Sequence, residues 1–457
     1  MANPLTFLFD PVDAEGDRVP ARYRFTGDQR WWMAPLGAGL VLLVVGVLAG
    51  LVGSGAPRVW FSYLIGWTFC LSITIGALFF VMIQHVTRAR WSVTIRRIAE
   101  VLMASFPLLA LAGLPLLFGM YDLYHWTHSE LFDPASPDYD YIVAGKAAYL
   151  NTPFFLVRYV LYFAVWTLVA TKLYTLSVRN DRAPDAENTL KMRWWSALGI
   201  PLAAVTTAFA SYDFLMSTDP HWFSTMFGVY FFAGGWLGAL CLITFLALLL
   251  KKAGMAPEIT TEHTQDMGKF MFAFVVFWTY VAFSQYMLYW YANIPEEIMW
   301  FHKRFAGGWE TVSWALLIFH FVLPFLILLP RATKRIAPAL ATMAVWLLVM
   351  HFVDLWWIAM PSMHAAYDAG HAALQAGGGD LLASLQVHGA TAAEAAHEST
   401  SGMAIHVVEP HLPLVEMAVW LGLFGLFLGA TFLRLGRHAL TPYGDPYFAD
   451  WLRFEDG

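Results

Sequence analysis

The stretch Tyr212–Thr225, YDFLMSTDPHWFST, ends one long apolar segment and begins another. Its Asp213 lies inside the first segment, where a charged side chain is costly. Further along, residues 353–361 read VDLWWIAMP, and Asp354 stands seven residues before a proline, as Asp213 stands seven before Pro220. A carboxylate that recurs at the same position relative to two apolar segments predicts a membrane protein in which the buried aspartates have a function.

The composition supports the same fold class. The 457 residues are 59% hydrophobic and only 13% charged, whereas soluble domains carry about 25% charged residues. Successive apolar runs of about 20 residues predict an all-α polytopic membrane protein. We predict ten transmembrane spans, at residues 31–53, 60–87, 98–120, 152–176, 194–216, 221–250, 268–292, 309–330, 336–360 and 413–435.

The basic residues predict the orientation. Most of the 27 Lys and Arg residues lie at one set of span ends, so the positive-inside rule places both termini in the cytoplasm. Residues 1–30 and 436–457 are then cytoplasmic segments, and Asp213 and Asp354 lie near the outer face. The extracytoplasmic loop 361–412 is rich in histidine, and its His spacing follows no tight ligand pattern, which favours a solvated loop over a metal site.

The doubled aspartate also predicts an internal repeat. The end of the third span and the end of the seventh share the pattern Tyr-x-Leu-Tyr, at Tyr121 and Tyr286. Both echoes are four spans apart, so the two copies would share one orientation. The simplest architecture is two four-helix bundles, spans 2–5 (60–216) and spans 6–9 (221–360). Spans 1 and 10 (31–53 and 413–435) are then peripheral helices.

Ionisable side chains inside hydrocarbon cost at least about 2.5–3.5 kcal/mol, so each is a functional candidate that needs a partner. Arg158 and Asp213 lie at similar depth in adjacent spans, which predicts a buried pair that either serves a function or only locks two helices. Asp354 has His351 one turn earlier on the same helix face. A carboxylate beside an imidazole can hold and pass a proton, or the two groups can simply satisfy each other. The proton-relay candidates are Asp213, Asp354, His351, His320, Arg158, Glu100, His85 and Lys172.

His320 and His351 allow a competing interpretation. They could face each other at one depth as axial ligands of a haem, but each His has a simpler explanation, so haem is the less favoured reading. The sequence has no phosphate-binding glycine loop, nucleophile elbow or Cys/His metal motif. No metal site and no covalently bound cofactor are therefore predicted.

Three stretches carry a resemblance to a known family. They are MIQHVTRARWSVTIRRIAEVL (Met82–Leu102), STDPHWFSTMFGVYFFAGG (Ser217–Gly235) and FMFAFVVFWTYVAFSQYMLYWYANIPEEIMWFHKR (Phe270–Arg304). They resemble the NrfD-like, polysulfide-reductase-type integral membrane subunits, and more narrowly those of alternative complex III, a quinol:cytochrome c oxidoreductase. The chain looks closer to the second such subunit (ActF type) than to the first. The resemblance covers spans two to ten.

The resemblance implies a subunit of a respiratory complex in the bacterial cytoplasmic (inner) membrane. Expected partners are an iron–sulfur/molybdopterin-like subunit, multihaem and monohaem cytochrome c subunits, a paralogous NrfD-like subunit, small membrane subunits and a terminal oxidase. No nucleic acid is expected. Quinol or menaquinol and lipids are the expected ligands. The resemblance implies that the first NrfD-like subunit of such a complex holds the main quinol-oxidising site. It implies that the second is associated with proton translocation or coupling.

Three functions remain open at this point. In the first, the chain is an integral subunit that provides a proton path and is not catalytic alone. In the second, it oxidises quinol itself near the outer face, with quinol-binding candidates Asp122, His125, Arg158 and Asp213. In the third, it is a stand-alone membrane transporter in which the repeat is the moving unit.

Overall fold

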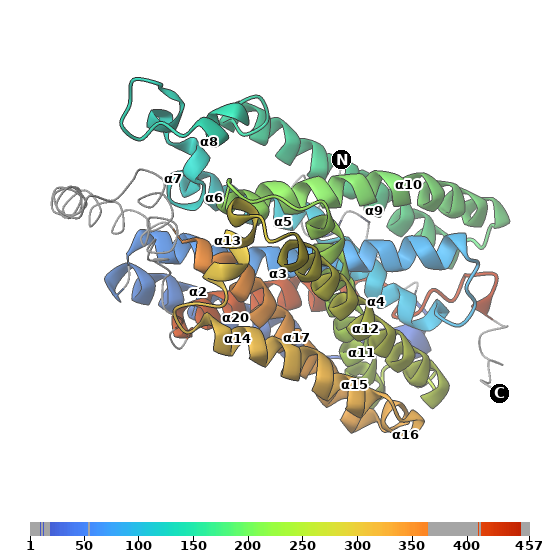
Figure 1. The fold of residues 1–457 in the computed structure, drawn as a ribbon. Helices are drawn as coiled ribbons and strands as arrows, with labels where there is room; N and C mark the ends of the chain where they lie inside the picture. The colour runs from blue at the N-terminus through green and yellow to red at the C-terminus, as the bar shows by residue number, and fades with distance from the viewer. Residues whose placement is uncertain are drawn as a thin grey trace, which may run out of the picture.

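The computed structural model describes residues 19–53, 55–363 and 413–448, together with residues 10, 12 and 410. The histidine-rich loop predicted at 361–412 therefore lies almost entirely outside the described residues. Within them the chain is helical, and ten helices are long and apolar enough to cross a membrane. The prediction of an all-α polytopic membrane protein is confirmed (Figure 1).

The first four-helix bundle contains α3 (Ala56–Val86), a broken third span, α9 (Thr152–Arg182) and α10 (Ala186–Phe214). The third span is divided into α4 (Val93–Met103), α5 (Phe106–Ala112) and α6 (Leu114–Phe118). Each new piece has a proline in its first turn, at Pro107 and Pro115, where the missing N–H costs least. At the start of α9, Asn151 caps the helix by accepting a hydrogen bond from the Phe154 N–H.

The second bundle contains α11 (Met226–Lys252), α12 (Thr261–Ala292), a broken eighth span and α17 (Ala337–Ala359). The eighth span consists of α14 (Trp309–Ala315), a π-helical turn η6 (Leu316–Val322) and α15 (Leu323–Leu328). Pro324 lies just after this turn and cannot donate to the carbonyl four residues earlier, which favours the wider π geometry. Between α12 and α14, the short helix α13 (Pro295–Lys303) follows Asn293, which has a left-handed backbone.

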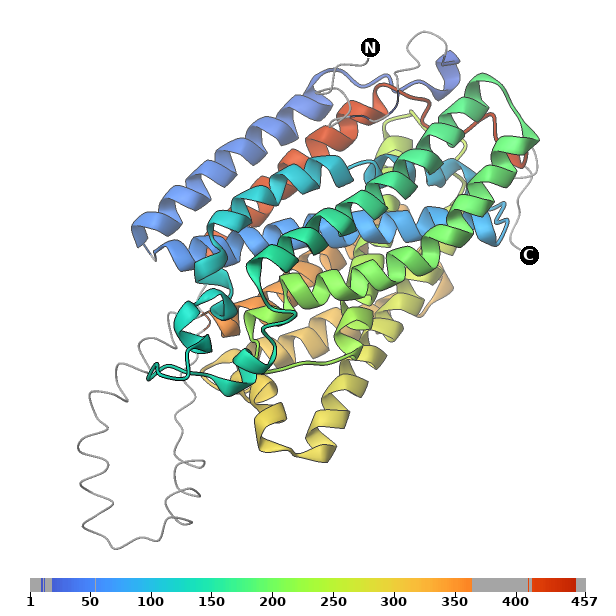
Figure 2. The same cartoon turned by 90° about the horizontal axis from the view of Figure 1, so that it is seen from above.

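The predicted peripheral helices pack against each other. These are α2 (Arg30–Gly53) and α20 (Leu414–Leu435), and their backbones approach closely where glycines meet. A β-carbon on Gly39 would lie 2.7 Å from the carbonyl oxygen of Gly422. Helix α20 also packs on α3, where Trp420 meets Phe69 edge to face at 5.3 Å between centroids. The same Trp420 stacks on Phe352 of α17 at 4.3 Å. Figure 2 shows α2 and the α12–α13 region at opposite edges of the molecule.

Short helices fill the connections. They are η2 (Ala21–Tyr23), α7 (Met120–Leu123), η3 (His125–Thr127), η4 (Ser129–Phe132), α8 (Tyr141–Gly145), η5 (Met216–Thr218), α16 (Arg331–Arg335) and η7 (Met360–Ser362). The two terminal segments meet at one end of the molecule, where Tyr23 stacks on Tyr443. We call this the basic end, because the Arg- and Lys-rich connections lie there; the opposite end carries residues 119–151, 215–225 and 293–308.

Several helices are longer than the apolar runs predicted. Helix α9 continues to Arg182, α10 begins at Ala186 and α12 begins at Thr261, all at the basic end. Hydropathy predicts only the apolar part of a helix that lies in the hydrocarbon of the membrane. The polar turns at these helix ends lie outside that part, so the apolar runs were shorter than the helices. The two bundles meet where α3 crosses α11: a β-carbon on Gly76 would lie 2.5 Å from the carbonyl oxygen of Gly235. Only glycine permits this approach of two helix backbones.

Candidate functional site

The first buried acid, Asp213, is held by a cation. Arg158 Nε and Nη2 donate to its two carboxylate oxygens at 2.8 and 2.9 Å, and the Tyr162 hydroxyl donates to Oδ2 at 2.6 Å. The third guanidinium nitrogen donates to the carbonyl of Tyr149 at 2.9 Å. The predicted pairing of Arg158 with Asp213 is confirmed as a bidentate ion pair. Both oxygens of Asp213 are engaged within the protein, and the guanidinium of Arg158 compensates the buried carboxylate.

The second buried acid, Asp354, has a different environment. The Tyr230 hydroxyl donates to its Oδ1, and Trp278 Nε1 donates to Oδ2 at 3.3 Å. Both donors are neutral, and among the described residues no Lys or Arg forms a salt bridge with this carboxylate. Asp354 is only 2% exposed. A carboxyl group with neutral partners can exist in either protonation state, whereas one bound to a guanidinium is fixed as an anion.

His351 lies beside this acid but does not bond to it. Its Nε2 forms a hydrogen bond with Ser72 Oγ at 2.9 Å, and Ser72 donates its own proton to the carbonyl of Phe69. We therefore assign the ring proton of His351 to Nε2, which leaves Nδ1 as a bare acceptor. No residue in the described part of the chain bonds to that Nδ1. The predicted Asp–His neighbourhood exists, with Ser72 of the other bundle as the direct partner of the imidazole.

A glycine pair on α11 makes space for this arrangement. A β-carbon on Gly234 would lie 3.2 Å from His351 Nδ1 and 3.7 Å from Asp354 Oδ2. One turn further along, a β-carbon on Gly238 would lie 3.2 Å from His351 Cδ2. The bare nitrogen of the imidazole and an oxygen of the carboxyl group therefore face the same side-chain-free spot on α11.

His320 completes the cluster from the π-helical turn. Its ring stacks on Trp278 with centroids 3.9 Å apart, and Trp278 in turn bonds to Asp354. The side chain is fully buried, and neither ring nitrogen has a partner among the described residues. Buried imidazole nitrogens without partners are rare and call for a function, and π-helical turns occur often at functional sites. We call Ser72, Tyr230, Trp278, His320, His351 and Asp354 the Asp354 cluster.

Glu100 belongs to a separate network at the basic end. Its carboxylate lies 3.2 Å from Arg96 Nε and 3.3 Å from Arg97 Nη1, and it accepts hydrogen bonds from the Ser177 hydroxyl. The two arginines also bind Asp181 and Asp445, and Asp445 comes from the tail after α20. Although burial opposes ionisation, the charge of Arg96 holds the pKa of Asp445 below its ordinary value. This network joins the tail to the first bundle.

The remaining relay candidates lie apart from both buried acids. His85 is buried near the basic end, and its Nε2 has no partner in the described ranges. Lys172 instead lies on the exposed face of α9, with Nζ 5.8 Å from the ring of Trp195. The prediction of Lys172 as a proton-relay residue does not agree with this exposed position. Lys172 lies near the end of the apolar run predicted at 152–176, and from there a long Lys side chain reaches the interface more easily than it enters a bundle.

The other quinol-binding candidates lie at the opposite end. Asp122 is in α7 and accepts a hydrogen bond from Trp60, and burial raises its pKa above the ordinary value. His125 is buried in η3, three residues further on. Asp213, by contrast, bonds with Arg158 and Tyr162. The structure therefore places Arg158 with Asp213 and leaves Asp122 and His125 in a different segment.

Charged groups link the connecting segments at the end of the molecule opposite the basic end. Lys303 Nζ lies 2.6 Å from Asp219, and although burial opposes ionisation, this cation holds the pKa of Asp219 at about 2. His221 Nε2 lies 2.5 Å from Asp140. Burial alone would raise the pKa of Asp140. The hydrogen bond from the backbone N–H of Val143 and the neighbouring His221 together outweigh burial, so the pKa of Asp140 lies below its ordinary value. A polar cavity of about 420 Å³ lies here, and its lining also includes His125, His128, Glu130 and Asp138.

Along α3 the polar side chains are interrupted between the Asp354 cluster and the basic end. On α3, residues 75–83 between Ser72 and Gln84 carry no polar side chain, which corresponds to roughly 13 Å of helix at 1.5 Å per residue. The buried relay candidates thus include three separate groups, the Asp354 cluster, the Arg158–Asp213 pair and the Glu100 network. Within the described ranges no three His, Cys, Asp or Glu residues are placed to hold a metal ion.

Sequence reasoning missed Tyr230, Trp278 and Ser72, which are the actual partners of Asp354 and His351. Tyr and Trp are abundant in this chain, so neither stands out by composition. The spacing of Gly234 and Gly238 one turn apart is the signal that could have indicated a close neighbour on that face of α11. No protein-family model and no curated protein matches this chain.

Proposed function

We propose that this protein is an integral membrane subunit of a quinol:cytochrome c oxidoreductase complex, and that it transfers protons while electrons pass through other subunits. The assignment to such a complex rests on the sequence resemblance. The proton role rests on one observation: Asp354 is buried within a membrane-spanning helix, and its hydrogen-bond partners among the described residues are the neutral donors Tyr230 and Trp278. Such a residue can gain and lose a proton without breaking an ion pair.

We propose different roles for the two buried aspartates, Asp213 and Asp354. Asp213 is fixed by Arg158 and holds α9 and α10 together, so we assign it to structure. Asp354 lies beside His351 and is linked through Trp278 to His320, and each imidazole has a ring nitrogen without a partner among the described residues, so we assign Asp354 to proton transfer. The quinol-oxidising alternative at Asp213 is less well supported, because its carboxylate oxygens are already engaged by protein donors.

The test is Asp354→Asn in the complex purified from the native membrane and reconstituted into vesicles. We expect quinol oxidation to remain within about twofold of wild type, because electrons do not pass through this residue. Proton release per electron should fall, because asparagine cannot cycle between charge states. Asp133→Asn, at an exposed acid, is the matched control and should leave both quantities unchanged.

Two outcomes would contradict the proposal. If Asp354→Asn leaves proton release per electron at the wild-type value, the cluster does not carry protons. If Asp213→Asn abolishes quinol oxidation in a complex that still assembles, the site of oxidation lies in this chain.

A further inference from the structure

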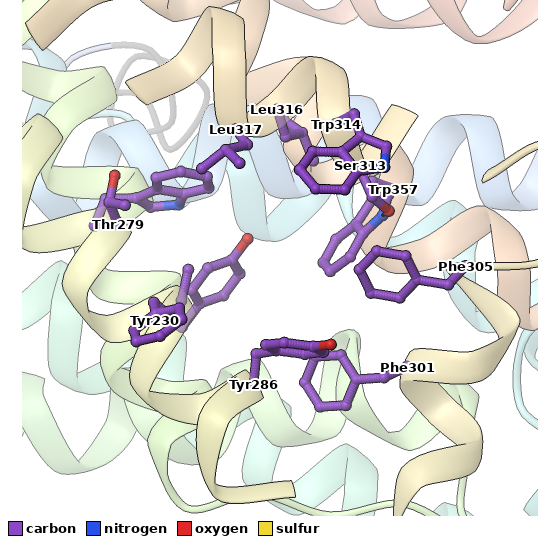
Figure 3. Close-up of a pocket in the computed structure, with 13 residues that line it drawn as sticks. Tyr230, Thr279, Tyr286, Phe301, Phe305, Ser313, Trp314, Leu316, Leu317 and Trp357 are labelled. Carbon is purple, nitrogen blue, oxygen red and sulfur yellow. Dashed lines mark hydrogen bonds between the residues drawn. The ribbon is translucent and has the colours of Figure 1, made fainter. Parts of the chain in front are cut away.

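An apolar cavity of about 360 Å³ lies directly beside the Asp354 cluster. It is enclosed by α12, α13, α14, η6 and α17, and α11 contributes Tyr230. Figure 3 shows the rings of Tyr230, Tyr286, Phe301, Trp314 and Trp357 around one common space. The volume falls in the range of small-molecule sites, about 300–1,000 Å³.

The cavity is accessible from the side of the helices. Its lining includes Phe283, which is 60% exposed, and Trp314, which is 58% exposed. Both lie on candidate membrane-spanning segments, Phe283 on α12 and Trp314 on the span Trp309–Leu328. A ligand that is dissolved in the membrane could therefore enter between these two side chains without crossing water.

The walls favour a flat ring over a hydrocarbon chain. Most of the lining is aromatic, and ring faces stack on other rings with a gain of about 0.5–1.5 kcal/mol beyond the area buried. A saturated chain would gain burial only, and it would offer nothing to the hydroxyl of Tyr230. The cavity therefore suits a compound with an aromatic ring and a polar group.

Tyr230 determines which polar group fits. The lining also carries hydroxyls on Thr279, Tyr286 and Ser313, and the Tyr230 hydroxyl donates its single proton to Asp354. The phenolic oxygen keeps lone pairs that can accept a hydrogen bond. While Asp354 is ionised and accepts this proton, a ligand at the Tyr230 oxygen must donate, so a hydroxyl fits there and an ether or carbonyl does not.

We propose that this cavity binds the ring of a membrane-soluble hydroxylated aromatic compound, whose hydroxyl donates to the oxygen of Tyr230. The ligand hydroxyl, Tyr230 and Asp354 then form one hydrogen-bonded chain. This last consequence rests on the proposed function, because it places the ligand in contact with the proton-transferring carboxyl group. The binding site itself does not depend on that function.

The experiment is photolabelling of the intact complex in detergent with a 2-naphthol that carries a diazirine. Labelled peptides are identified by mass spectrometry, and unlabelled 2-naphthol and 2-methoxynaphthalene compete. We expect labels within residues 278–286 and 313–317. We expect 2-naphthol to compete roughly fivefold better than its methyl ether, the value of one net hydrogen bond of about 1 kcal/mol. Tyr230→Phe should remove that difference while the ring still binds.

Two alanines on α12 provide a matched pair of variants. Ala282→Trp fills the cavity, since Ala282 lines it, and should abolish labelling. Ala273→Trp places the same side chain at an exposed position of the same helix and should leave labelling unchanged. The proposal is overturned if Ala282→Trp is still labelled, if the naphthol and its ether compete equally in wild type, or if excess phosphatidylcholine competes as well as 2-naphthol.

The outcomes separate the two proposals. Labelling requires no turnover, so absent labelling together with a lowered proton yield in Asp354→Asn would reject the ligand site alone. Specific labelling together with an unchanged proton yield in Asp354→Asn would reject the proton role alone.

Discussion

Removal of the guanidinium from the Arg158–Asp213 pair should destabilise the protein strongly. In Arg158→Met, Asp213 keeps one hydrogen bond, from Tyr162 at 2.6 Å, and loses the two from the guanidinium. The acid is 1% exposed, so water does not replace the lost partner. Breaking a buried pair on one side costs about 3–5 kcal/mol. We therefore expect the free energy of unfolding to fall by about that amount.

The double variant tests the cause. Arg158→Met with Asp213→Leu removes the orphaned charge, and a buried pair replaced by apolar side chains is often neutral in stability. Tyr162 then loses its acceptor, at a cost of about 1–3 kcal/mol. We expect the double variant to be more stable than Arg158→Met by at least about 1 kcal/mol. Lys172→Met removes an exposed cation from the same helix and should change stability by less than about 0.5 kcal/mol.

The assay is reversible unfolding in mixed micelles, followed by circular dichroism and evaluated as a double-mutant cycle. The reasoning is refuted if Arg158→Met stays within about 1 kcal/mol of wild type, given the cost expected for a broken buried pair. It is also refuted if the double variant is no more stable than the single one. In that second case the loss would come from packing of the long Arg side chain and not from an uncompensated charge.

Two further predictions concern stability. Lys303→Met should lower the free energy of unfolding at pH 7 by about 2 kcal/mol, because Lys303 holds the pKa of Asp219 at about 2 against an ordinary 3.8. A depressed carboxyl pKa stabilises above the unfolded value, so in wild type this contribution is complete above about pH 4 and is lost as the pH falls through 2; a loss that does not diminish in acid would contradict it. Gly76→Ala should destabilise by about 1–3 kcal/mol, because its β-carbon would lie 2.5 Å from a backbone oxygen of α11. Gly37→Ala, with nothing within 4 Å, is its control in the same melting experiment, and equal melting temperatures would refute the clash.

The sequence predicted the ten spans and their order because long apolar runs are a one-dimensional signal. Depth is also one-dimensional, since it follows from counting residues along a helix, and this is why the pairing of Arg158 with Asp213 could be predicted. Rotation about the helix axis is not visible in one sequence. The exposure of Lys172 and the choice of Ser72 as the partner of His351 depend on that rotation, and so they could not be predicted.

The predicted internal repeat was informative and incomplete for a related reason. It marked Asp213 and Asp354 as corresponding positions, each near the end of the last helix of its bundle. Yet one acid accepts from Tyr162 on α9 and the other from Tyr230 on α11, which are not corresponding helices. Similar spacing in sequence fixed the position of the acids along the bundle but not their chemical surroundings.

The contact of α3 with α11 at Gly76 and Gly235 has a mechanical consequence. Two backbones in contact act as a fulcrum: if one bundle tilts against the other, the displacement grows with distance from this point. Ser72 lies one turn from Gly76, about 6 Å along the helix, so its bond to His351 moves little during a tilt. The contacts at the far ends, such as Lys303 with Asp219, move most. A rocking motion would thus displace the contacts at the two ends of the helices most, while the hydrogen bond of His351 to Ser72 near the contact point would stay in place.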